Sequence, residues 1–145
     1  MAGTISVRDF AAALKDGEPL APIDVREPAE YNMAHIPGVF SLPRRQIEFR
    51  VRAFDPHLAT RIVLLCDDGR RSALAAMTLE AMGYTNVLVL QGGANRWAAD
   101  DMPTEWGVNV PSKAFGEVVL HRGGVPEITA DELQQWRDRG EDFVL

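Results

Sequence analysis

Short apolar segments alternate with longer amphipathic ones along the first hundred residues. Mostly apolar runs predict buried strands at Leu20–Val25, Arg61–Leu65 and Asn86–Leu90. Such runs are too short for helices and are bounded by polar or glycine-containing segments. Strands that alternate with helices favour an α/β layer sandwich around a mostly parallel sheet, whose ligands lie outside the carboxyl ends of the strands.

The segments around these strands carry helix signals. Ser6 and Asp9 predict the capped start of a helix that Gly17 ends. From Ser72 to Met82 apolar residues recur at helical spacing, and Gly83 is suited to a left-handed cap. A further helix is predicted at Arg44–Phe54, whereas Arg26–Asn32 is interpreted as a polar connection.

The end of the chain repeats the layout of its start. Ile5 corresponds to Ile128, Ser6 to Thr129, Asp9 to Glu132, Phe10 to Leu133 and Gly17 to Gly140. We therefore expect one domain at residues 1–107, a Gly- and Pro-containing linker at 108–127 and the truncated start of a second repeat at 128–145. The alternative is a C-terminal helix that packs back on the domain.

Composition narrows the function classes. The 145 residues are 46% hydrophobic, enough for one domain with a core, and the net charge of -6 argues against nucleic acid as the main partner. No apolar run approaches the length of a membrane span. With a single, unpaired cysteine, the chain is expected in the cytoplasm.

That cysteine, Cys66, directly follows a predicted strand and precedes a predicted helix. If Cys66–Arg71 curls so that its backbone N–H groups point inward, with the helix starting near Ser72, those groups and the helix dipole would stabilise a sulfur anion. Gly69 permits the turn that this needs. The alternative is a small buried hydrophobic residue at a strand end.

Two neighbouring carboxylates oppose such a site. Asp67 and Asp68 would repel an anionic sulfur donor such as thiosulfate, unless they point outward while Arg70 or Arg71 faces the pocket.

The loop resembles the rhodanese active-site loop, which has cysteine, two variable residues, glycine, one variable residue, arginine and serine. Three further segments agree with that family in order and spacing. They are Ile23-Asp24-Val25-Arg26-Glu27-Pro28-Ala29-Glu30-Tyr31, His35-Ile36-Pro37-Gly38-Val39 and Leu90-Gln91-Gly92-Gly93-Ala94-Asn95-Arg96-Trp97. The resemblance covers about Thr4 to Glu105. Ala34 and Asp101 replace usual glycines, which is expected to alter only turns.

The resemblance implies a five-stranded, mostly parallel sheet flanked by helices on both faces, and a sulfurtransferase. Cys66 would take a sulfane sulfur from a donor such as thiosulfate and pass it, as a persulfide, to a thiophilic acceptor such as cyanide or a thiol. Its substrate-binding residues would be Asp67, Asp68, Gly69, Arg70, Arg71 and Ser72. Arg71 matches the loop arginine that contacts an anion, whereas Arg70 occupies a variable position.

The implied partners are a small sulfur-containing anion or persulfide donor, a thiol or protein acceptor, and further rhodanese repeats, without a cofactor or metal. One alternative is a non-catalytic or sulfur-carrier module that binds a partner protein. Another is a phosphatase or arsenate reductase, which the resemblance disfavours because the related enzymes have a longer loop. Asp24, Arg26 and His35 are expected to be structural.

Overall fold

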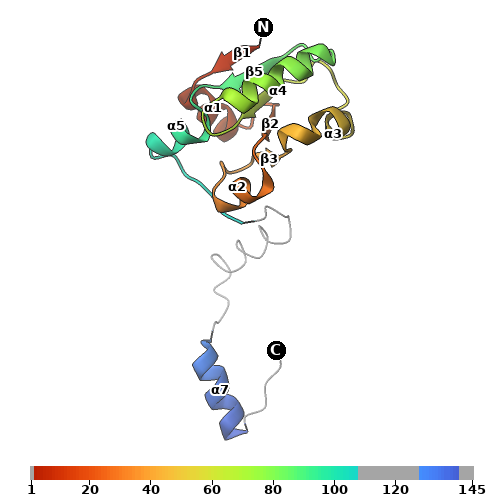
Figure 1. Ribbon diagram of the computed structural model, residues 1–145. Coiled ribbons are helices and arrows are strands. Elements are labelled where there is room, and N and C mark those ends of the chain that lie inside the picture. Colours follow the sequence, from red (N-terminus) through yellow and green to blue (C-terminus); the bar gives the residue numbers. More distant parts are fainter. Residues whose placement is uncertain (1, 108–127, 141–145) are drawn as a thin grey trace. The chain divides into compact units, whose positions relative to one another are not determined.

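The computed structural model describes residues 2–107 and 128–140. The chain divides into two units, Met1–Gly107 and Val108–Leu145. The first unit contains a sheet with the strand order β1-β5-β4-β2-β3, and every strand pair in it is parallel. Its strands are β1 (Gly3–Ile5), β2 (Ala21–Asp24), β3 (Phe40–Ser41), β4 (Ile62–Leu65) and β5 (Val87–Leu90). The predicted five-stranded parallel sheet is confirmed (Figure 1).

Helices connect the strands and cover the sheet. They are α1 (Val7–Asp16), α2 (Pro28–Met33), α3 (Ile47–Phe54), α4 (Arg70–Ala81) and α5 (Gly93–Ala99), with a 3-10 turn, η1 (Arg44–Gln46), before α3. In the second unit, α7 spans Ala130–Arg139. None of the helices in the described ranges is long and apolar enough to cross a membrane.

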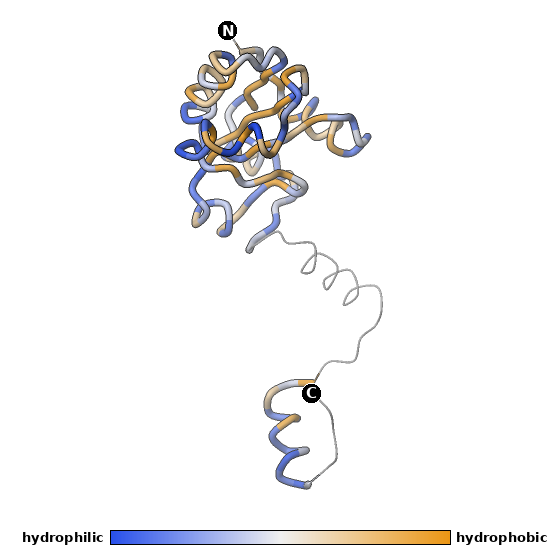
Figure 2. Tube along the Cα trace, turned by 90° about the vertical axis from the view of Figure 1, so that its right-hand side faces the viewer, coloured by the Kyte–Doolittle hydropathy of each residue, from blue (hydrophilic) through white to orange (hydrophobic). Residues whose placement is uncertain are grey.

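The central strand β4 is buried on both faces. Ile62 and Leu64 pack in a cluster with residues of α3 and α4, whereas Val63 and Leu65 pack with residues of α1 and α5. This alternation follows from the period of a strand, whose successive side chains point to opposite faces. Apolar segments accordingly lie inside the domain and hydrophilic ones on its loops (Figure 2). The expectation of helices on both faces is therefore confirmed.

The hydrophobic and polar patterns did not predict four short elements. These are β1, β3, α2 and α5. β3 has two residues, both exposed, so it carries no apolar run. α2 lies in the segment that we interpreted as a polar connection, and only Tyr31 in it is buried. Its signal was the capping box of Glu27 and Glu30 with Pro28 in its first turn.

Two predicted helices have different boundaries. α4 starts at Arg70, two residues before the expected Ser72, because Gly69 adopts a left-handed conformation as its N-cap. The segment predicted as one helix at Arg44–Phe54 divides into η1 and α3. Gln46, the last residue of η1 and the N-cap of α3, has a φ of -111°. Gly83 has a φ of 97°, as expected after α4.

α1 and α7 have matching ends. The Ser6 hydroxyl accepts from the Asp9 N–H at 3.1 Å, and the Thr129 hydroxyl accepts from the Glu132 N–H at 3.2 Å. Both helices end at a left-handed glycine, Gly17 or Gly140. The matched caps agree with the internal repeat, and the second rhodanese repeat stays a prediction. Its linker at 108–127 and its last residues, 141–145, lie outside the described residues.

Asp101 stands where the family usually has glycine. Its φ of 53° is the only positive value at a non-glycine residue in the described part of the chain. Aspartate tolerates the left-handed region better than most residues, so the turn after α5 is preserved without glycine.

Candidate functional site

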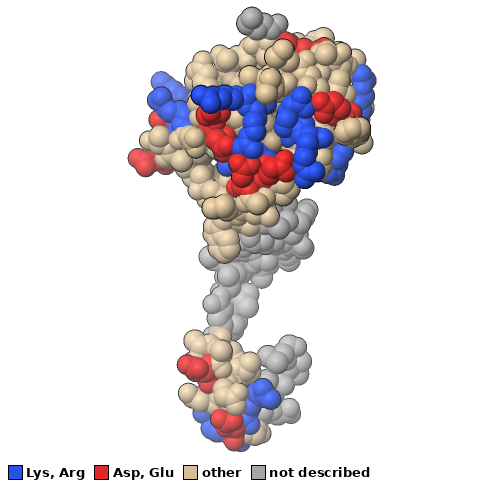
Figure 3. Space-filling view, in the orientation of Figure 1, with Lys and Arg blue, Asp and Glu red and all other residues tan. Residues whose placement is uncertain are grey.

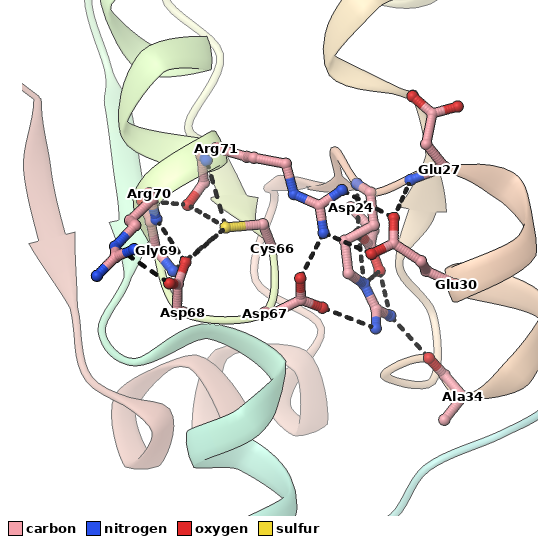
Figure 4. Close-up of polar contacts among 12 residues, drawn as sticks. Asp24, Glu27, Glu30, Ala34, Cys66, Asp67, Asp68, Gly69, Arg70 and Arg71 are labelled. Carbon is pink, nitrogen blue, oxygen red and sulfur yellow. Dashed lines mark hydrogen bonds and ion pairs between the residues drawn. The ribbon is translucent and has the colours of Figure 1, made fainter.

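Cys66 lies at the carboxyl end of β4, where the chain turns into α4. Its side chain is buried, with an exposed fraction of 0%. Gly69 has a φ of 95°, which brings the first turn of α4 back toward the sulfur (Figure 4). A strand end, a left-handed glycine and a helix N-terminus thus position one thiol.

The sulfur of Cys66 accepts hydrogen bonds from backbone N–H groups. The donors are Gly69 at 3.2 Å and Ser72 at 3.4 Å. The Ser72 hydroxyl lies 3.5 Å from the sulfur and donates to the Gly69 carbonyl at 3.0 Å. Such N–H groups favour a negatively charged sulfur over a neutral thiol.

Not every amide of the loop points inward. The Arg70 N–H donates to the Asp68 carboxylate at 3.0 Å instead of to the sulfur. That bond lowers the pKa of Asp68, which therefore stays ionised at neutral pH. The same Asp68 oxygen lies 3.9 Å from the sulfur. Asp68 therefore places a negative charge beside Cys66.

The first turn of α5 holds the loop from the other side. Ala94 N–H donates to the Cys66 carbonyl at 2.8 Å, and Asn95 N–H donates to the Asp67 carbonyl at 3.0 Å. A β-carbon on Gly93, whose φ is 58°, would lie 2.1 Å from the Cys66 carbonyl oxygen. No local pattern in the sequence predicted this close approach of backbone to backbone.

Arg71 does not face the sulfur. Its terminal nitrogens donate to both carboxylate oxygens of Glu30, at 2.8 and 2.7 Å, and Nη2 also donates to Asp67. These partners raise the pKa of Arg71, so it remains charged. The side chain extends from the loop toward Glu30 (Figure 4). The predicted role of Arg71 as an anion contact stays a prediction. Glu30 belongs to one of the four motifs, but nothing in that motif indicated that it pairs with Arg71.

Arg70 is also directed away from the sulfur. Its side chain is 90% exposed, and its Nε lies 3.3 Å from the Asp68 carboxylate. Neither arginine faces the sulfur in this conformation, so the arrangement that would offset the repulsion by Asp67 and Asp68 is not seen here. The substrate-binding roles of the loop residues stay predictions.

A buried ion pair supports the loop from β2. Asp24 is 0% exposed and accepts from the Arg26 Nε and Nη2 at 2.9 and 2.7 Å. Burial opposes the charge of Arg26, but the hydrogen bond and attraction of Asp24 outweigh it and raise the pKa of Arg26. Arg26 Nη2 also donates to the Ala34 carbonyl at 2.7 Å, and Nη1 lies 3.6 Å from Asp67. These contacts are those of a buried structural pair, and Arg26 also contacts the loop through Asp67.

His35 has a structural environment. Its Nδ1 lies 2.9 Å from the Tyr31 carbonyl, and the two rings stack with centroids 3.9 Å apart. Its Nε2 lies 3.7 Å from the Glu105 carboxylate. These contacts tie α2 to the segment after α5, in agreement with the expected structural role.

Basic and acidic side chains lie side by side on the face of the domain that Figure 3 shows. Arg44 pairs with Glu48 at 2.8 Å, and Arg45 pairs with Glu27 at 3.1 Å. Since these arginines face carboxylates, they do not form an uninterrupted basic rim.

The bond between Glu30 and Arg71 should give the fold a specific pH dependence. Arg71 lowers the pKa of Glu30 from 4.5 to about 2. A lowered carboxylate pKa stabilises the folded state above the ordinary value, and this stabilisation is lost as the pH falls through the lowered value. We expect Glu30→Gln, which can still cap α2, to lower the melting temperature at pH 7.

The measurement is thermal unfolding of both proteins from pH 2 to pH 7. The difference in melting temperature should shrink below pH about 4.5 and disappear near pH about 2. A difference that does not change with pH would show that Glu30 contributes only by packing.

Comparisons with known proteins agree with this geometry. Residues 6–100 match the rhodanese-like domain. A sulfurtransferase of Allochromatium vinosum is 32% identical over 103 residues, which cover 71% of this chain and 94% of that protein. YrkF of Bacillus subtilis, named as a candidate sulfur carrier protein, is 36% identical over 93 residues, 64% of this chain and 49% of that protein.

A solved structure also matches. The crystal structure of a thiosulfate sulfurtransferase from Pseudomonas aeruginosa has a TM-score of 0.79 and 33% identity, and the match covers 96% of this chain and 26% of that one. The chain thus spans about half the length of YrkF and about a quarter of the Pseudomonas chain. Its fold, its loop sequence and the match over residues 6–100 show that the chain belongs to the rhodanese-like domain family.

Proposed function

We propose that this domain transfers a sulfane sulfur from a donor to an acceptor through a persulfide on Cys66. The observation that carries the proposal is the buried Cys66 sulfur, which accepts the Gly69 and Ser72 N–H groups at the start of α4. These donors are already positioned in the folded loop, so they stabilise a sulfur anion without rearrangement.

The reaction has two displacements. The Cys66 thiolate attacks the outer sulfur of the donor, a new S–S bond forms, and the donor's own bond to that sulfur breaks. The leaving group takes the electron pair, as sulfite from thiosulfate or as a thiolate from a persulfide. The acceptor then attacks the outer sulfur of the Cys66 persulfide, and Cys66 leaves as the thiolate. Cyanide would become thiocyanate, and a thiol would become a persulfide.

The relatives support this assignment at the level of the reaction class. Several are named sulfurtransferases, and PspE of Escherichia coli and the Pseudomonas protein are named for thiosulfate. Thiosulfate as the donor, and cyanide or a thiol as the acceptor, are proposals for this chain. So are a cytoplasmic location and further rhodanese repeats, which the match to a quarter of the Pseudomonas chain supports.

A sulfur-carrier module is the second candidate. It is favoured by the carboxylates that occupy Arg70 and Arg71, because an arginine that is already paired contacts a small anionic donor less readily. The match to YrkF supports it as well. Such a module would hold a persulfide on Cys66 and pass it to a partner protein, with negligible turnover of small molecules.

Intact-mass spectrometry tests the proposal. We expect the reduced protein to gain one sulfur atom after incubation with a persulfide donor, and to lose it on addition of cyanide, with thiocyanate released. Peptide mapping should place the sulfur on Cys66. A mass that no donor changes would contradict the transferase and the carrier alike. A protein that gains sulfur but does not release it to cyanide or a thiol would favour the carrier.

A further inference from the structure

The arginines around the Cys66 loop are all paired with carboxylates. Arg71 contacts Glu30 and Asp67, Arg70 contacts Asp68, and Arg26 contacts Asp24 and Asp67. Three arginines thus face four carboxylates. Asp67 is the carboxylate that two arginines share, and it leaves the surroundings of the loop with an excess of negative charge.

Asp67 also determines where one N–H of Arg71 points. Arg71 Nη2 donates to Glu30 at 2.7 Å and to Asp67. A guanidinium Nη carries two N–H groups, so both are used. Because Asp67 belongs to the loop and Glu30 belongs to α2, the N–H that Asp67 binds is the one directed back toward the loop (Figure 4).

Sulfur donors differ in whether they need a cationic N–H group such as the one that Arg71 directs toward the loop. Thiosulfate is a dianion whose sulfonate oxygens call for cationic or N–H contacts. The persulfide group of a donor R–S–S⁻ carries a single negative charge, and that charge lies on the sulfur to be transferred. The Gly69 and Ser72 N–H groups therefore suffice for a persulfide, while a sulfonate would compete with Asp67 for Arg71.

We propose that Asp67 is a specificity-determining residue, which occupies the Arg71 N–H directed toward the loop and so selects persulfide donors over thiosulfate. This inference rests on the proposed function. Asp67 acts through Arg71 and is thus a positioning residue.

The step that it favours is balanced without a further reactant. The Cys66 thiolate attacks the outer sulfur of R–S–S⁻, the bond between the two donor sulfurs breaks, and R–S⁻ leaves with the electron pair. Cys66 keeps the outer sulfur and one negative charge as a persulfide. No sulfonate enters or leaves the loop in this step.

The test compares two donors, thiosulfate and glutathione persulfide, by their kcat/KM for loading Cys66. We expect Asp67→Ala to raise the thiosulfate value about tenfold relative to the persulfide value, because it removes one like charge and frees one Arg71 N–H. Asp68→Ala is the matched control. It removes the same charge but releases Arg70, whose side chain is 90% exposed, instead of Arg71. Asp68 also lies 3.9 Å from the Cys66 sulfur, an influence that both donors share, so we expect a relative rise of about threefold at most.

A double variant shows whether Asp67 acts through Arg71. With Arg71→Gln already in place, Asp67→Ala should raise the relative thiosulfate value no more than Asp68→Ala does. An equal rise in both backgrounds, or a rise no larger than that of Asp68→Ala, would overturn the inference and leave a simple charge effect. Equal kcat/KM values for thiosulfate and glutathione persulfide in the protein without substitutions would also overturn the inference. Failure of every donor to load Cys66 is a different result, since it would contradict the proposed function itself.

Discussion

Replacing Cys66 by serine should abolish sulfur uptake from every donor while the domain stays folded. The hydroxyl of serine is a poor nucleophile without an activating base, whereas a thiolate in this loop needs none. Serine is close to cysteine in size, and the Gly69 and Ser72 N–H groups can donate to its oxygen. We therefore expect the free energy of unfolding to change by only about 1 kcal/mol.

We would compare the Cys66→Ser variant with the unsubstituted protein in two ways. Intact mass after incubation with a donor measures sulfur uptake, and thermal unfolding of the same sample measures stability. A Cys66→Ser protein that still gains a sulfur atom released by cyanide would refute the persulfide on Cys66, because no other cysteine is present. Loss of folding in this variant would instead assign Cys66 a packing role, which is the alternative for a buried thiol at a strand end. If the domain is a scaffold, partner binding should survive the substitution.

The parts of the fold that could be predicted are those where one local signal decides the structure. The strands at Ala21–Asp24, Ile62–Leu65 and Val87–Leu90 agree with predicted runs to within one residue at each end. Ile62–Leu65 and Val87–Leu90 are uninterrupted apolar segments, as expected for strands of a covered parallel sheet, and Ala21–Asp24 is apolar up to the buried Asp24. The helix caps at Ser6 and Thr129 could also be predicted from the sequence, since each depends on two residues that are three positions apart.

The parts that could not be predicted depend on contacts between distant segments. β1 has three residues and pairs with β5, more than eighty positions away, so its own sequence carries little information. Arg71 illustrates the same point in the site. Its partner Glu30 lies in α2, 41 positions earlier in the chain. A pattern within the loop cannot show that the Arg71 guanidinium binds this carboxylate.

Gly93 gives the second large expected effect. Alanine at this position should lower the free energy of unfolding by about 3–5 kcal/mol and prevent sulfur loading. The added β-carbon would lie 2.1 Å from the Cys66 carbonyl oxygen and 2.6 Å from that of Asp67. Both are backbone atoms held by the first turn of α5, so neither can move aside without breaking the bonds from Ala94 and Asn95.

Gly17→Ala is the matched control for this substitution. Gly17 has a φ of 67°, similar to the 58° of Gly93, but no atom lies within 4 Å of the position of its added β-carbon. It should therefore lose only the backbone preference, about 1–2 kcal/mol, and keep sulfur loading. Chemical unfolding and intact mass, measured on both variants, separate the effect of the left-handed backbone from that of the steric clash. Equal losses at Gly17 and Gly93 would mean that backbone conformation alone requires the glycine, whereas a larger loss at Gly93 would show that the close approach of α5 keeps the Cys66 loop in shape.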